Sequence, residues 1–221
     1  MELIPLAPNL WHVESMFGSI FPVRMVVRRT DEGITLWAPV AIDEELAVSI
    51  GDLGPVRTIV APNLFHYAHV ARAQELFPGS RVLAPEGLRE KKPEVPIDEF
   101  LEPGLELGDG CKVHAVEGSA VISEFVLHDE ATKTLVVTDL LFNVRRAHNW
   151  RSWFVFKVVA GTLGDVGQSR LWKSFVKDKE AAGASMRALN ELPFERLIVG
   201  HGEVVEEGGQ AALAKGTARW L

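Results

Sequence analysis

The sequence contains a single cysteine, Cys111, among its 221 residues. One thiol cannot form an internal disulfide, and it cannot build a thiolate cluster for a metal. Any metal ion held by this chain must therefore bind to histidine and carboxylate side chains. Basic residues are also scarce, because 23 Lys and Arg stand against 30 Asp and Glu, a formal net charge of −7. Binding to nucleic-acid phosphates requires a basic surface, so we expect no nucleic-acid partner.

Long apolar runs are missing as well. The longest one near the middle of the chain, Trp153–Gly161, is interrupted by Lys157. It is much shorter than the roughly 20 residues that span a bilayer. The first residues, MELIPLAPNLW, lack the basic region and long apolar run of a signal peptide. We therefore expect a cytoplasmic protein with no membrane partner.

The stretch Arg57–Pro85 predicts a strand, a helix and a second strand in succession. Thr58–Ala61 is a short β-branched and apolar run that ends at a Pro-Asn pair. Tyr67–Phe77 has the apolar spacing of a helix, and a Pro-Gly pair ends it before the strand Arg81–Ala84. Ligands of open α/β sheets usually bind at the carboxyl ends of such strands.

The remaining pattern predicts one mixed α/β domain over residues 1–221, in which Arg89–Pro103 is a polar surface loop. Further strands are expected at Leu10–Val13, Met25–Val27, Ile34–Pro39, Lys112–Val116, Glu124–His128, Thr134–Thr138 and Arg196–Val199, and further helices at Glu44–Ile50, Lys179–Leu192 and Gly209–Leu221. Asp43 is expected to cap the first of these helices. Thr30-Asp31-Glu32-Gly33 is expected to form a hairpin turn between the strands Met25–Val27 and Ile34–Pro39.

Residues 143–178, here called the Trp/Arg-rich segment, differ from their surroundings. They contain Trp150, Trp153, Trp172, several arginines and a glycine-rich centre. Such a helical insertion is typical of a lid, of a contact between subunits of a homo-oligomer, or of a packed helical hairpin.

Four side chains are candidate metal ligands: His66, His69, Asp139 and His201. Each lies directly after a predicted apolar strand. If these strands are neighbours in one sheet, the four side chains gather at one edge, and neutral imidazoles with a carboxylate suit zinc or iron. Each residue also has a simpler interpretation. A single histidine is commonly a helix cap or a surface group, and Asp139 could cap a turn.

The order of these parts resembles the metallo-β-lactamase superfamily. TLVVTDLLF is similar to the superfamily strand that ends before a metal-bridging aspartate, which falls on Asp139. RLIVGHGEVV is similar to its late Gly-His-Gly, which places the last metal-binding histidine on His201. The resemblance covers nearly the whole chain and is closest to a divergent branch known as a domain of unknown function. It implies an α+β fold of the αββα sandwich type, with four layers.

The sequence also departs from the superfamily pattern. When the last histidine of the motif His-x-His-x-Asp-His is placed on His69, Leu64 replaces the first histidine and Ala68 replaces the aspartate. The position of the middle histidine falls on Gly118. A complete two-metal site is therefore not encoded. The resemblance leaves the set His69, Asp139 and His201 for one metal, and it places Asn63, Glu117 and Ser119 at the expected pocket.

Two hypotheses follow. The chain could be a one-metal hydrolase of an ester, thioester, lactone or phosphoester, with zinc, iron or manganese lowering the pKa of a bound water towards about 7. His66 would then be a fourth ligand or a proton shuttle. Alternatively, the fold could have lost its metal and could bind a small molecule or a partner chain as a scaffold. An Asp139–His201 hydrogen bond would then only join two strands.

Overall fold

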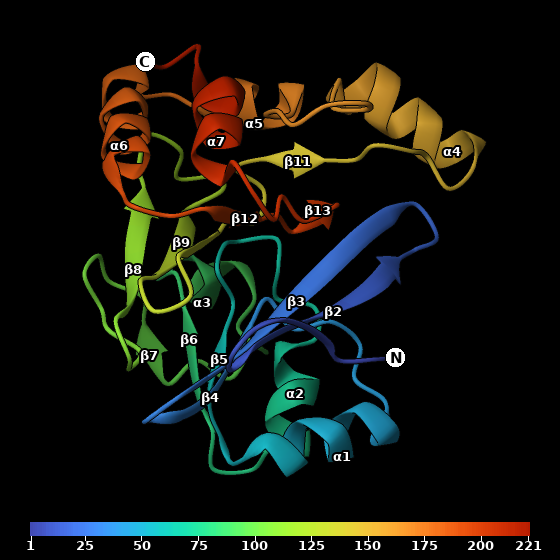
Figure 1. Ribbon diagram of the computed structural model, residues 1–221, viewed down its shortest axis with the longest axis vertical. Helices are drawn as coiled ribbons and strands as arrows, with labels where there is room; N and C mark the ends of the chain where they lie inside the picture. Colours follow the sequence, from blue (N-terminus) through green and yellow to red (C-terminus); the bar gives the residue numbers. More distant parts are fainter.

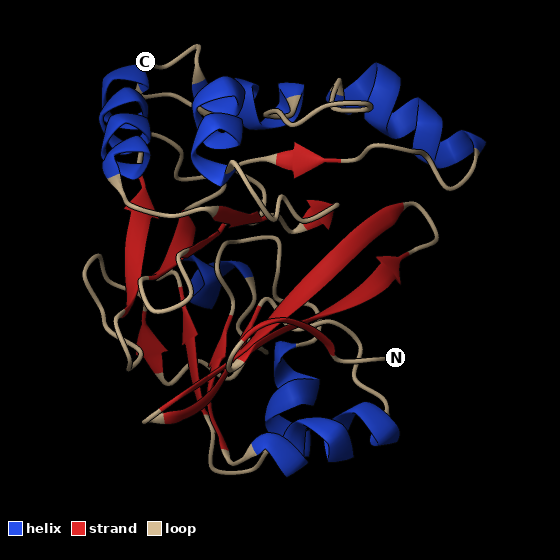
Figure 2. Ribbon diagram, in the orientation of Figure 1, coloured by secondary structure: helices blue, strands red, loops and turns tan.

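Two β-sheets pack face to face in the computed structural model, which describes residues 1–221 (Figures 1 and 2). The larger sheet has seven strands in sequence order: β1 (Ile4–Ala7), β2 (Leu10–Phe17), β3 (Phe21–Thr30), β4 (Gly33–Trp37), β5 (Val56–Val60), β6 (Arg81–Ala84) and β7 (Glu99–Phe100). Strands β1 to β4 pair antiparallel, and β4 to β7 pair parallel. The turn between β3 and β4 is the predicted hairpin, since Thr30 pairs with Gly33.

The second sheet has the strand order β12-β10-β9-β8. Its members are β8 (Cys111–Val116), β9 (Glu124–Asp129), β10 (Thr134–Val136) and β12 (Arg196–Ile198). Strand β10 pairs antiparallel with β9 and parallel with β12. Strands β11 (Phe142–Asn143) and β13 (His201–Gly202) form a separate, short parallel pair that follows β10 and β12 in the chain.

Helices cover the outer faces of both sheets, so the molecule has four layers (Figure 1). Helices α1 (Glu44–Leu53) and α2 (Val70–Leu76) lie against the larger sheet, and the short α3 (Gly87–Lys91) follows β6. On the other side lie α5 (Arg170–Phe175), α6 (Lys179–Glu191) and α7 (Gly209–Thr217). Helix α4 (Trp150–Trp153) continues directly into a π-helix, η1 (Phe154–Ala160).

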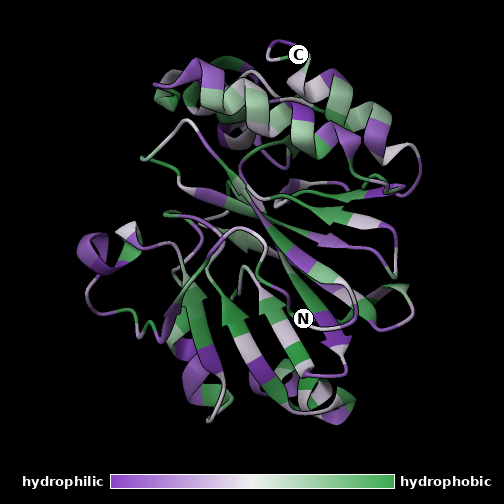
Figure 3. Ribbon diagram, turned by 90° about the vertical axis from the view of Figure 1, so that its left-hand side faces the viewer, coloured by the Kyte–Doolittle hydropathy of each residue, from purple (hydrophilic) through white to green (hydrophobic).

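The core is divided by the sheets into separate apolar layers. On β3, Met25 and Val27 pack with the α1 and α2 side, whereas Val26 faces the layer between the sheets. This is the period of two that a strand imposes on its side chains. Green, hydrophobic stretches occur on strands of both sheets in Figure 3, where white and purple stretches interrupt them.

Two segments of the fold differ from the sequence expectations, the start of α2 and the expected loop Arg89–Pro103. Helix α2 begins at Val70 rather than at Tyr67, because the Oδ1 atom of Asn63 accepts the backbone N–H groups of Phe65 and His66 and holds a turn there. The expected loop Arg89–Pro103 contains the end of α3 and strand β7, which pairs with β6.

A buried ion pair joins the two sheets. The Nε atom of Arg28 on β3 donates to Oδ2 of Asp129 on β9 at 2.6 Å, and the two side chains are 3% and 1% exposed. The hydroxyl of Thr132 donates to the same carboxylate. Cys111 lies beside this pair, and burial together with the Asp129 charge raises the pKa of its thiol to about 12. The single cysteine is therefore a neutral, unreactive core residue.

Replacing Asp129→Ala should lower the free energy of unfolding by about 3–5 kcal/mol, because the Arg28 guanidinium would remain buried without a counter-charge. Urea denaturation measures this directly. The matched control is Glu75→Ala, which breaks the exposed ion pair with Arg72 and should cost no more than about 1 kcal/mol. Equal losses in the two variants would contradict the importance of the buried pair.

Candidate metal site

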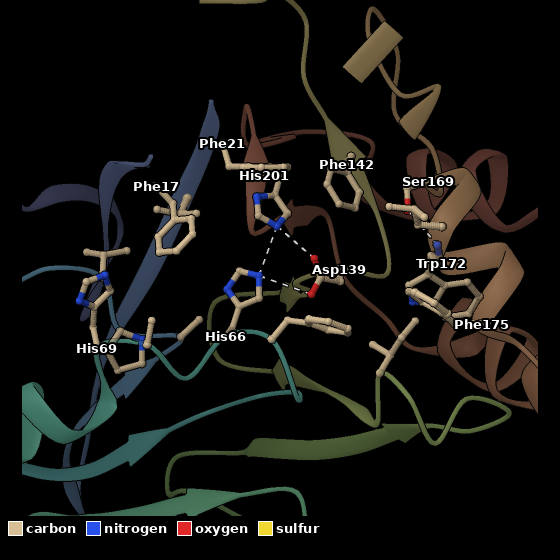
Figure 4. Close-up of a pocket in the computed structure, with 18 residues that line it drawn as sticks. Phe17, Phe21, His66, His69, Asp139, Phe142, Ser169, Trp172, Phe175 and His201 are labelled. Atoms are coloured by element: carbon tan, nitrogen blue, oxygen red, sulfur yellow. Dashed lines mark hydrogen bonds and ion pairs between the residues drawn. The ribbon is translucent and has the colours of Figure 1, made fainter. Parts of the chain in front are cut away.

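Three side chains from three separate segments of the chain meet at one edge of the sandwich. His66 follows β5, Asp139 follows β10, and His201 lies on β13 after β12. The Nε2 atom of His201 is 3.0 Å from Oδ1 of Asp139 and 3.2 Å from Nε2 of His66. The Nε2 atom of His66 is 3.5 Å from Oδ2 of Asp139 (Figure 4). One ligand atom from each side chain lies within 4.8 Å of the others.

The sequence expectation that these side chains gather was conditional on their strands being neighbours in one sheet, and the strands instead belong to two sheets. Strand β5 is in the seven-stranded sheet, whereas β10 and β12 are in the four-stranded sheet. Their carboxyl ends meet because the two sheets face each other with these ends at the same edge. The site is therefore built across the sandwich, and it depends on the packing between the sheets.

Glycines fix the backbone around His201. A Cβ atom on Gly202, which has a φ of +100°, would lie 2.2 Å from the backbone oxygen of Asn143. A Cβ atom on Gly200 would lie 3.1 Å from Cα of Thr138. Both approaches are too close for any other residue without rearrangement, so the Gly-His-Gly sequence allows β13 to pair with β11 and to present the imidazole.

The His201 ring is held so that its Nε2 atom faces the cluster. Its Nδ1 donates to the backbone oxygen of Pro22 at 2.8 Å, and the ring stacks on Phe142 with a centroid separation of 4.6 Å. A neutral imidazole that donates from Nδ1 has an acceptor lone pair at Nε2. That lone pair points at an Asp139 oxygen and at His66, which is favourable only when a proton or metal cation lies among them.

The donor set and its spacing fit a single metal ion. Metal–ligand bonds of about 2.0–2.2 Å in tetrahedral geometry separate the ligand atoms by about 3.3–3.6 Å. The three separations in the cluster, 3.0 to 3.5 Å, lie within a few tenths of an ångström of that range. Two imidazoles and one carboxylate are a donor set suited to zinc, iron or manganese.

Two buried polar residues position Asp139. The amide of Asn63 donates to Oδ2 of Asp139 at 2.8 Å. Glu124, which is 1% exposed, accepts the backbone N–H groups of Thr138 and Leu140 through Oε1 at 2.8 and 3.0 Å. These are the residues on either side of Asp139, so Glu124 fixes the turn that carries the carboxylate.

The pKa values of the Asp139 and Glu124 carboxyl groups are shifted in opposite directions. Burial opposes the ionisation of Asp139, but the His66 and His201 imidazoles outweigh it and hold the pKa of Asp139 well below its usual value. Burial and the nearby Asp139 charge raise the pKa of Glu124 to about 7. The ionised form of the pair is thus concentrated on Asp139, where the imidazoles lie.

The other predicted site residues lie elsewhere. His69 is the N-cap residue of α2 and lines the same cavity, but its imidazole lies apart from the three clustered side chains (Figure 4). The structure thus groups Asp139 and His201 with His66 rather than with His69. Glu117 is exposed and Ser119 is buried, and neither lines the cavity. Between them, Gly118 packs tightly against the backbone of Asp178 at the start of α6.

A cavity of about 360 Å³ opens beside the cluster. Its walls are mainly apolar and no lysine or arginine lines it; the lining residues are Phe17, Phe21, Val23, Ala38, Pro39, Val40, Phe65, His66, Ala68, His69, Ile122, Asp139, Phe142, Ser169, Leu171, Trp172, Phe175 and His201. No local sequence pattern indicates most of these residues, because they are far apart in the chain and are brought together only by the packing of sheets and helices.

Solved structures of metallo-beta-lactamases have a similar fold. A metallo-beta-lactamase from Hirschia baltica aligns over 99% of this chain and 96% of its own, with a TM-score of 0.66 and 14% identity. A metallo-beta-lactamase family protein from Thermus thermophilus aligns over 97% and 80%, with a TM-score of 0.64 and 16% identity. The chain has the metallo-β-lactamase fold.

A third structure with this fold, a flavodiiron core from Synechocystis, aligns over 99% of this chain and 60% of its own, with a TM-score of 0.65 and 12% identity. Comparison with protein-family profiles and with curated protein sequences gives no match. The αββα sandwich implied by the sequence resemblance is confirmed. Leu64, which the sequence resemblance aligned with the first histidine of the motif, is buried in the core.

The raised pKa of Glu124 leads to a pH prediction. An acid whose pKa rises from its ordinary 4.5 in the unfolded chain to about 7 in the folded one stabilises the fold fully below about 4.5, and this contribution is lost as pH rises to about 7. Glu124→Gln keeps the accepting oxygen but cannot titrate. The free energy of unfolding of the wild type, minus that of the variant, should therefore fall across this window.

The measurement is urea denaturation of chelator-treated protein at a series of pH values, so that no bound cation alters the field at Asp139. A difference that stays flat from pH 4.5 to 7 would contradict the shifted pKa of Glu124.

Proposed function

We propose that this chain is a hydrolase that holds one metal ion, zinc, iron or manganese, on His66, Asp139 and His201. The observation that carries this proposal is the convergence of the His201 Nε2 atom, the His66 Nε2 atom and the Asp139 carboxylate within 3.0–3.5 Å. Three acceptor-bearing atoms that face one another are favourable only with a proton or a metal cation between them, and a metal ion is the cation that we propose. We also place the chain in the divergent domain-of-unknown-function branch, on the sequence resemblance alone.

A metal ion bound there would supply Lewis acidity and would lower the pKa of a bound water towards about 7. The chain's own residues provide the rest. Asp139 contributes a negative charge that offsets the cation, and Asn63 orients that carboxylate. The Pro22 carbonyl fixes the tautomer of His201, as partners of metal-bound histidines commonly do.

The cavity favours an uncharged, apolar acyl group in the substrate. Twelve of its 18 lining residues are hydrophobic, and no lysine or arginine is present to bind a phosphoryl group. Phe175, Phe65 and Ile122 offer aromatic and aliphatic walls beside the cluster. We therefore propose a carboxylic ester or thioester with an apolar acyl chain as the substrate class, in preference to a phosphoester.

The metal content of the purified protein tests the site. Protein prepared without chelators and without a metal-binding tag should contain about one equivalent of metal by mass spectrometry. His66→Ala and His201→Ala should each lose it, because each variant leaves two of the three ligands. His69→Ala is the matched control, since it removes an imidazole from the same cavity but should keep the metal.

Loss of metal in His69→Ala, with retention in His66→Ala, would contradict the ligand set. A second candidate function, a metal-free binding protein, is favoured by the direct 3.0 Å contact between His201 and Asp139, which could join two loops without an ion. That candidate predicts no metal in the wild type, even after reconstitution with zinc, iron or manganese.

The substrate class is tested with p-nitrophenyl esters of increasing acyl length. From acetate to octanoate, kcat/KM should rise by up to about fourfold per added methylene group, the value expected for burying each methylene in an apolar site. p-Nitrophenyl phosphate should not be cleaved. Hydrolysis of the phosphate, or equal rates for all acyl lengths, would contradict an apolar acyl site.

A further inference from the structure

The α4–η1 helix carries an apolar face with no partner in the chain. Its inner face is buried through Ser152, Phe156 and Ala160, which recur every four residues. Phe156 packs edge-on against Phe21 with a centroid separation of 5.6 Å. The residues exposed on the other side, here called the outer face, are Trp150, Trp153, Phe154, Val158 and Val159, with exposed fractions of 73%, 49%, 49%, 43% and 39%.

The charge around this helix is opposite to that of the whole chain. The Trp/Arg-rich segment holds seven of the 23 Lys and Arg but only two of the 30 Asp and Glu. Both acids are already engaged, since Asp165 pairs with Lys215 and Asp178 caps α6 through the N–H of Ala181. Arg151 and Lys157 are exposed on the helix itself. An acidic protein thus presents a locally basic surface around exposed tryptophans.

We propose that the outer face docks in the plane of an anionic lipid surface, with Arg151 and Lys157 at the level of the headgroups. Exposed Trp and Phe side chains with flanking Lys and Arg are the features of helices that lie within a membrane interface. No helix of the chain is long and apolar enough to cross a membrane. A helix that lies flat on the surface needs no such length.

Charge complementarity favours lipid over a second copy of this chain. A symmetric dimer through the outer face would bring two basic segments together, and like charges at close range repel. Anionic headgroups would instead neutralise Arg151 and Lys157 while the aromatic side chains leave water. A second copy of this chain is the other occupant that the experiment distinguishes.

The helix also connects the two walls of the cavity. At its start, Asn149 donates to the backbone oxygen of Ser19 in the β2–β3 hairpin at 2.8 Å. Near its end, Arg170 donates to the backbone oxygen of Val158 at 2.6 Å. Phe17 from that hairpin and Leu171 from α5 line the cavity and are about half exposed. The docking proposal does not depend on the hydrolase proposal, since it rests on the helix and its charge alone.

The test is co-sedimentation of the full chain with two kinds of vesicle, phosphatidylcholine alone and phosphatidylcholine with about a third phosphatidylglycerol. The wild type should bind the anionic vesicles, and binding should weaken as salt is raised. Trp150→Ser/Trp153→Ser should reduce the partition coefficient at least about tenfold. Arg151→Gln/Lys157→Gln should reduce it about 30-fold, because each basic residue near the surface contributes about fivefold.

Two matched controls lie on exposed sites far from the segment in sequence. Val48→Ser on α1, a side chain that is 64% exposed, and Arg72→Gln/Arg57→Gln should each change binding less than about twofold. Circular dichroism checks that every variant is folded. The proposal is overturned if the wild type binds neither vesicle, or binds both equally. Equal losses in the controls, or a dimer by light scattering that only the segment variants abolish without any vesicle binding, would overturn it as well.

Discussion

The contact between His201 and Asp139 is the interaction on which the candidate metal site depends. It joins the end of β10 to β13 across 3.0 Å, at a place where a buried carboxylate would be costly alone. The imidazoles of His201 and His66 and the amide of Asn63 compensate that charge. Asn63 and His66 lie in the loop after β5 of the larger sheet, whereas His201 follows β12 of the second sheet, so the two sheets must be packed before the carboxylate is stabilised.

Asn63 and Glu124 position the side chains that make this contact. Asn63 bonds both Asp139 and the backbone N–H of His66, and so links two of the three clustered side chains. Glu124 supports the turn on either side of Asp139 through two backbone N–H groups. The Arg28–Asp129 pair, by contrast, lies within the sandwich and joins the sheets without touching the site. Site and scaffold therefore use separate buried charges.

Much of this arrangement was accessible from local sequence patterns. The hairpin at Thr30–Gly33, the cap at Asp43 and the positions of Asp139 and His201 at strand ends depend on neighbouring residues, and the structure has them as expected. The choice between His66 and His69 could not be made that way. It depends on the Asn63 turn, which delays the helix and directs His66 rather than His69 to the cluster.

Neither the cavity nor the outer face of the α4–η1 helix could be predicted from the sequence, and the reasons differ. Phe17, Phe142 and Phe175 share a cavity only because distant strands and helices are packed together. The basic surface could not be inferred from the net charge, because the value of −7 is a sum over the whole chain and the Trp/Arg-rich segment has more basic than acidic residues. The apolar run in this segment was expected to be too short to span a bilayer, and no helix of the structure is long enough. Which of its apolar side chains are exposed depends on how the helix packs, and this could not be predicted from the sequence.

His66, Asp139 and His201 are proposed to hold one metal ion. The most direct test is anomalous X-ray diffraction from crystals of the protein grown with zinc, collected on both sides of the zinc absorption edge. This account predicts a single strong peak within bonding distance of the two Nε2 atoms and the Asp139 carboxylate. A peak on His69 instead, or no peak near Asp139, would contradict it.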